Sequence, residues 1–167
     1  MALYFEGCLD SGPIGIGVKH LRWDEDLVQL PMQARIALLR EEHSAIFRQL
    51  GEVEKSFAKD RQRPQRRREL IDALGGRLRL HFVLEEETVY RPLNFVLKED
   101  SPTEELMEDH RSIRLAIKKL GRMDTSLREG QASMSDLMYQ LRFLDSALRK
   151  HLEKEEKVVF WLAEHNL

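Results

Sequence analysis

Apolar residues recur at spacings of three and four along most of the chain, from about residue 31 to about residue 164. This spacing is typical of amphipathic α-helices, and the alternating pattern of strands is nearly absent. It predicts four long helices, at about 31–58, 65–90, 101–129 and 133–164. Because the connections between them are short, we expect an all-α fold, an antiparallel up-down-up-down four-helix bundle.

Local signals refine the predicted helices. The segment Ser101-Pro102-Thr103-Glu104 predicts a capped helix start, with the serine as cap and the proline at the first helical position. Gly130 is expected to end that helix. Gly75 and Gly76 lie inside the second helix, where together they cost about 2 kcal/mol relative to alanine. We therefore expect a local bend or bulge at these two glycines.

The first 30 residues lack helical periodicity and are rich in glycine, with Pro13 among them. We therefore predict an N-terminal arm at 1–30 and one bundle domain at 31–167, a length that suits a single core. The longest apolar run near the C-terminus, 158–163, is far shorter than the roughly 20 residues of a membrane-spanning helix. No membrane association and no targeting segment are expected.

Composition narrows the possible functions. The chain has 27 basic and 29 acidic residues, a net charge of -2, so no nucleic-acid partner is expected. A basic tract at 61–68 is predicted to be a solvated turn and helix start. The single cysteine, Cys8, excludes an internal disulfide framework, a four-cysteine zinc site and a cysteine-held cluster. It also fits a cytoplasmic location.

The most informative feature is one histidine on the apolar face of each predicted helix. Two of these histidines are followed four residues later by a glutamate, which projects into the same space because residues i and i+4 lie about 40° apart on a helix. Counted from the helix ends in an antiparallel bundle, the four histidines fall at nearly one height. The six residues are His43, His81, Glu85, His110, His151 and Glu155.

Such a group in an apolar interior requires compensation, because buried ionised carboxylates are costly unless they are paired. The carboxylates could share protons with the histidines, but metal ions are the better solution. Imidazole and carboxylate are ligands of iron and manganese, and also of zinc. Six ligands are too many for one tetrahedral zinc and suit two ions, each with two histidines and both bridged by the two glutamates. The Glu-x-x-His motif of ferritin-like di-iron proteins is absent.

Several segments around these residues resemble the hemerythrin-like, or HHE cation-binding, family over about residues 30–165. They are Glu41-Glu42-His43, His81-Phe82-Val83-Leu84-Glu85-Glu86, Tyr90-Arg91-Pro92-Leu93, Glu108-Asp109-His110 and His151-Leu152-Glu153-Lys154-Glu155-Glu156. The resemblance implies a four-helix bundle around a non-haem centre of two iron ions that binds oxygen or nitric oxide. It also implies that the six residues named above are the ligands.

The chain departs from the oxygen-carrying members of this family at two positions. Those proteins have a second histidine four residues after the first on the third helix, where this chain has Arg114. Their last motif ends in an aspartate five residues after its histidine, whereas Glu155 lies at four. Arg114 could pair with a bridging glutamate, fill the missing ligand's place, hold an anion, or extend to solvent at the bundle edge.

These departures favour a role in sensing, nitric-oxide handling or iron-centre repair over reversible oxygen storage. The function expected first is binding or sensing of a small diatomic molecule, or iron and redox homeostasis. One alternative is a di-iron oxidoreductase that turns over peroxide or nitric oxide, although neither Tyr90 nor Tyr139 is clearly placed as its redox partner. Another is a metal-free helical interaction module. The sequence leaves enzymatic activity undecided and is compatible with a homo-oligomer.

Overall fold

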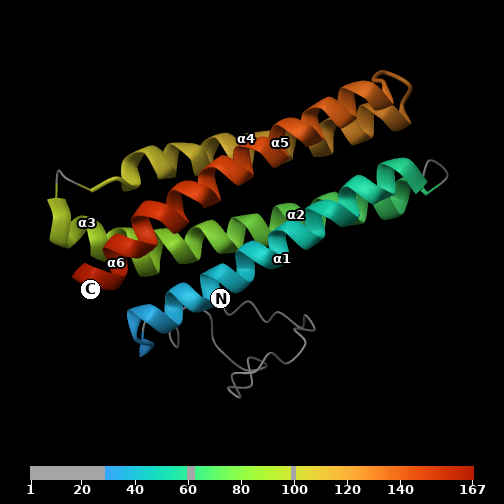
Figure 1. Ribbon diagram of the computed structural model, residues 1–167. Helices are drawn as coiled ribbons and strands as arrows, with labels where there is room; N and C mark the ends of the chain where they lie inside the picture. The colour runs from blue at the N-terminus through green and yellow to red at the C-terminus, as the bar shows by residue number, and fades with distance from the viewer. Residues whose placement is uncertain (1–28, 60–62, 99–100) are drawn as a thin grey trace, which may run out of the picture.

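The computed structural model of the protein describes residues 29–59, 63–98 and 101–167, so nearly all of the predicted arm at 1–30, including Cys8, lies outside the described residues. The described chain forms α-helices and two short π-helical segments, η3 and η5 (Figure 1). The elements are α1 (Met32–Lys59), α2 (Pro64–Glu85), η3 (Glu86–Tyr90), α3 (Arg91–Leu97), α4 (Thr103–Arg128), α5 (Met134–Lys154), η5 (Glu155–Val159) and α6 (Phe160–Asn166).

These elements form four antiparallel helical rods. The segments α2, η3 and α3 follow one another as one rod, and α5, η5 and α6 form another (Figure 1). Helix α1 packs against α2 and α5, and α4 packs against the same two helices, so the rods enclose a common core. The predicted all-α four-helix bundle is confirmed. No helix in the described part of the chain is long and apolar enough to cross a membrane.

The turn between α4 and α5 is defined by local sequence. Gly130 adopts a positive φ of 74°, which glycine accepts without a steric penalty. The amides of Gly130 and Gln131 donate to the carbonyls of Leu127 and Ser126, the pattern of a Schellman motif that ends a helix. Ser133 and Asp136 then form a reciprocal capping box that starts α5. The predicted end of the third helix at Gly130 is confirmed.

Two local predictions are wrong. Ser101 does not cap α4, because Pro102 occupies the N-cap position without a side-chain hydrogen bond. The hydroxyls of Ser101 and Thr103 instead donate to the side-chain oxygen of Asn94, on the preceding helix α3. Asn94 lies seven residues before Ser101, so its competition for the Ser101 hydroxyl is not visible in the four-residue pattern.

The second wrong prediction concerns the glycine pair in the second helix. Helix α2 continues as a regular α-helix through Gly75 and Gly76. A Cβ atom added at Gly75 would lie 3.4 Å from the Ile117 side chain of α4, at the near limit of ordinary van der Waals contact, so Gly75 lies on the face of α2 that packs against α4. The bulges occur elsewhere, in η3 and η5.

The buried core is divided into two apolar clusters, one toward each end of the bundle. The larger cluster lies around Leu74, Leu78, Leu120 and Leu144, and the smaller one around Ile36, Leu93 and Phe160. Their members are distributed over all four rods, as the three- and four-residue spacing predicts. Between the two clusters lies a layer of buried histidines and glutamates.

The basic tract before α2 is not uniformly solvated, contrary to the prediction. Arg67 is 2% exposed and forms an ion pair with Asp124 of α4, which is fully buried. Arg68 reaches the same helix, where it donates to the carbonyl of Gly121 and the hydroxyl of Thr125. These two arginines therefore attach the start of α2 to the end of α4.

Candidate metal centre

The structure brings all six sequence-predicted residues together in one buried layer. His43 extends from α1, His81 and Glu85 from α2, His110 from α4, His151 from α5 and Glu155 from the start of η5. Each of the six side chains is buried, with His43 the most exposed at 6%. Every rod contributes because each has one histidine on its inward face.

The six residues form two overlapping groups. One group contains His43 and His81, and the other contains His110 and His151, while Glu85 and Glu155 belong to both. In each group, one nitrogen or oxygen atom from every residue lies within 4.8 Å of the others. Such an arrangement suits two metal ions, each with two imidazoles, and two shared carboxylates.

The histidine Nε2 atoms are directed at the shared carboxylates. The Nε2 atom of His81 lies 2.9 Å from Glu85 Oε1, and that of His43 lies 3.2 Å from the same oxygen. On the other side, His110 Nε2 lies 3.3 Å from Glu85 Oε2, and His151 Nε2 lies 3.5 Å from Glu155 Oε2. All four rings therefore direct the same nitrogen at the centre of the layer.

Several of these atoms have no hydrogen-bond partner although they are buried. They are both ring nitrogens of His81, Glu85 Oε2, His151 Nδ1 and Glu155 Oε2. A buried polar atom without a partner costs about 1–3 kcal/mol, and native proteins contain few of them. Three of these atoms face the centre, namely His81 Nε2, Glu85 Oε2 and Glu155 Oε2. Metal coordination would satisfy their lone pairs, so the donor set fits a pair of cations.

Electrostatic coupling within the layer is strong. Burial alone would lower the pKa of His43, but hydrogen bonds to Glu155 and Glu85 raise it to about 10. Burial and the charge of Glu85 raise the pKa of Glu155 to about 7. Burial opposes ionisation of Glu85, but the charge of His81 and hydrogen bonds from His110 and His43 lower its pKa well below the usual value. Because ligands must be deprotonated, a metal would compete with the protons that these groups share.

The structure adds Tyr90, which the sequence analysis did not assign to the site. Its hydroxyl donates to Glu155 and lies 3.5 Å from His110 Nε2, and its ring stacks on the His110 ring with centroids 5.5 Å apart. Burial and the charges of Glu85 and Glu155 raise the pKa of Tyr90, so the phenol stays protonated. On an α-helix, residues five apart point about 140° apart. The π-helical segment η3 has a wider turn, with i to i+5 hydrogen bonds, and so brings Tyr90 to the same face as Glu85.

Phe160 is the counterpart of Tyr90 in the other half of the site. It lies five residues after Glu155, just beyond η5, and is fully buried. Its ring stacks on His43 with centroids 5.6 Å apart and an angle of 14° between the planes. The two halves thus share one design, a histidine ring covered by an aromatic ring that a π-helical segment directs inward.

Arg114 pairs with a glutamate, but not with one of the two shared ones. Its Nη2 donates to Glu86 Oε1 at 2.7 Å, and its guanidinium lies over the Phe82 ring, 5.3 Å from the centroid. The hypothesis that it pairs with a bridging glutamate is wrong, because its partner is the residue after Glu85. The side chain is 35% exposed, so it lies at the edge of the bundle beside the candidate centre.

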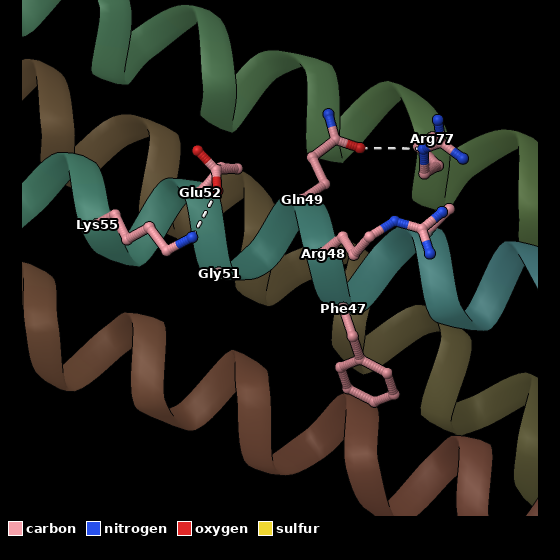
Figure 2. A pocket seen from close by; sticks show the side chains of 8 residues that line it. Phe47, Arg48, Gln49, Gly51, Glu52, Lys55 and Arg77 are labelled. Carbon is pink, nitrogen blue, oxygen red and sulfur yellow. Dashed lines mark hydrogen bonds and ion pairs between the residues drawn. The ribbon is translucent and has the colours of Figure 1, made fainter. Parts of the chain in front are cut away.

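A surface hollow of about 660 Å³ lies along α1 and α2 (Figure 2). Four of the polar side chains that line it are paired: Arg77 donates to Gln49 Oε1 at 3.0 Å, and Lys55 pairs with Glu52. None of the six predicted ligands lines it. His165, a histidine outside the six predicted ligands, is exposed near the C-terminus and packs on Trp161.

Comparison with known protein families matches residues 34–163 to hemerythrin, described as the hemerythrin HHE cation binding domain. The match spans most of the chain and includes all six residues of the buried layer. No curated protein and no solved structure matches the chain.

Proposed function

Since the chain belongs to the hemerythrin HHE cation-binding domain family, we propose that it holds two iron ions in the bundle and there binds or senses a small molecule such as oxygen or nitric oxide, or serves iron and redox homeostasis. The supporting observation is the pair of buried ligand groups that share Glu85 and Glu155. A cytoplasmic location is part of the same proposal.

In this proposal His43 and His81 would hold one ion, His110 and His151 would hold the other, and Glu85 and Glu155 would serve both. Bound iron would supply redox chemistry and open coordination positions for a diatomic ligand, and zinc or manganese could use the same donor types. The chain itself provides a dry, fixed frame. The two apolar clusters on either side of the layer exclude water, and Phe82 stacks on His110 with centroids 4.0 Å apart.

The test is gas binding by the protein loaded with ferrous iron under anaerobic conditions. We expect nitric oxide or oxygen to change the near-ultraviolet and visible spectrum of the parent. His81→Ala should reduce this change strongly, whereas His165→Ala, which alters an exposed histidine, should not. Circular dichroism would verify that each variant remains helical. An iron-loaded parent whose spectrum responds to neither gas would contradict binding or sensing of a diatomic ligand, and only the role in iron and redox homeostasis would remain.

The position of Tyr90 favours one second candidate, a di-iron oxidoreductase. A buried phenol that donates to a bridging carboxylate is well placed to deliver a proton or an electron to the centre. Steady turnover of peroxide or nitric oxide by the iron-loaded parent, with a marked loss in Tyr90→Phe, would support this candidate. Gas binding without turnover would support the binding or sensing role instead.

A further inference from the structure

Each of the two His-x-x-x-Glu motifs is followed directly by a second glutamate. Glu86 follows Glu85, and Glu156 follows Glu155. These second glutamates do not belong to either of the ligand groups. They are partly buried, with side chains 26% and 37% exposed, at the outer edge of the histidine layer.

Glu86 contacts the histidine of a different rod. Its Oε1 lies 2.7 Å from Nδ1 of His110, the ring nitrogen opposite the one that faces the shared carboxylates. The same oxygen accepts a hydrogen bond from Arg114 Nη2 at 2.7 Å. Arg114 therefore anchors Glu86, and Glu86 in turn holds the outer edge of the His110 ring.

Glu156 makes the equivalent contact on the other side. Its Oε1 lies 3.2 Å from Nδ1 of His43, and its Oε2 accepts a hydrogen bond from Arg40 Nε at 2.8 Å. The arrangement is again arginine, glutamate, histidine. In both cases the contact joins one helical hairpin, α1–α2 or α4–α5, to the other.

The other two histidines lack such a partner. The Nδ1 atoms of His81 and His151 make no hydrogen bond, and the nearest carboxylate oxygen to His151 Nδ1, from Asp109, is 3.7 Å away. His81 and His151 each lie on the same rod as a shared glutamate, four residues before it. His43 and His110 have no glutamate four residues later, and they are the two that receive an outer carboxylate.

We propose that Glu86 and Glu156 are positioning residues of the metal centre, each orienting the histidine of the opposite hairpin through its Nδ1–H. A carboxylate at Nδ1 fixes the tautomer in which Nε2 has a free lone pair, and it fixes the plane of the ring. The inference rests on the proposed function, because it concerns ligands of the two ions. It assigns Glu86 to the ion of the His110 group and Glu156 to the ion of the His43 group.

The test is a titration with Co²⁺, whose visible bands report the ligand field of each ion, applied to the full chain. The variants are Glu86→Gln, Glu156→Gln and the double variant. The controls are Glu87→Gln and Glu153→Gln, which change the neighbouring exposed glutamates that pair with Arg91 and Lys157. Arg114→Gln, at a half-exposed position, removes the anchor of Glu86 without changing Glu86 itself.

We expect each single variant to bind one of the two ions 10–100-fold more weakly, with altered visible bands, and the double variant to bind both weakly. Arg114→Gln should show a smaller loss for the same ion as Glu86→Gln, and the controls should match the parent. Two ions held at parental affinity in both single variants, or one ion still held tightly in the double variant, would overturn the inference while leaving the proposed function intact. A parent that binds no Co²⁺ would overturn both.

Discussion

A hydroxyl group is one difference between the two halves of the candidate centre. Tyr90 and Phe160 occupy equivalent places, each five residues after a shared glutamate and each stacked on a histidine from another rod. Only Tyr90 can donate a hydrogen bond, and it donates to Glu155. The two proposed ions therefore have different surroundings even though their ligand sets are alike.

The hydroxyl of Tyr90 should contribute measurably to the stability of the metal-free protein. Tyr90→Phe removes one hydrogen bond to a buried carboxyl group, so we expect the free energy of unfolding in urea to fall by about 1.5–3 kcal/mol. Tyr139→Phe is the matched control, because Tyr139 is 74% exposed. Equal stability of Tyr90→Phe and the parent would show that the hydrogen bond contributes nothing to stability.

The pair of Arg67 and Asp124 is a second buried polar feature, within the far half of the bundle. Arg67 is only 2% exposed, and Asp124→Asn would remove the negative charge that pairs with its guanidinium. We expect a loss of about 3–5 kcal/mol in the free energy of unfolding. Asp145→Asn, which breaks the exposed pair with Arg149, should cost at most about 1 kcal/mol. Similar losses in the two variants would contradict a buried ion pair.

At the scale of the elements, the helices and their inward faces were predictable because a period near 3.6 is visible in the sequence. His43, His81, His110 and His151 interrupt apolar stripes at that period, so they could be identified as inward-facing residues. The same rule fails within η3 and η5, where the period lengthens. It puts Val158 on the inward face, whereas the structure leaves Val158 43% exposed and buries Val159.

Contacts between distant segments account for the other differences. Tyr90 and Phe160 could not be assigned to the site because a π-helical segment cannot be recognised from apolar spacing. Arg67 belongs to a tract that resembles a solvated turn, and only the packing of α4 against α2 supplies its partner Asp124. Asn94 attracts the hydroxyl of Ser101 that the local pattern assigns to a helix cap.

Glycines in different local conformations should respond in opposite directions to the same substitution. Gly76 is helical and a Cβ atom there would meet nothing within 4 Å. Gly76→Ala should therefore raise the free energy of unfolding by about 0.5–1 kcal/mol. Gly130→Ala should lower it by about 1 kcal/mol, because φ is 74° at that position. Thermal unfolding of the two variants beside the parent measures both effects, and shifts of the same sign would contradict this assignment.

At the scale of the whole molecule, the polar layer separates two apolar clusters and joins all four rods. The larger cluster and the smaller one stabilise the bundle by burying apolar surface, as in any helical domain. The layer between them has several buried polar atoms without partners, which an apolar core would avoid. The unpaired atoms of this layer lower the stability of the metal-free protein, and bound metal would raise it by coordinating those that face the centre.

The central claim is that the six buried residues form one centre for two ions with both glutamates shared. The most direct test is the number of iron ions per chain, measured by native mass spectrometry for the parent and for Glu85→Ala. We predict two ions in the parent and loss of both in Glu85→Ala, because Glu85 belongs to both ligand groups. Glu87→Ala, at the exposed neighbouring position, should retain both. A parent without bound iron, or a Glu85→Ala variant that still holds two ions, would contradict the account.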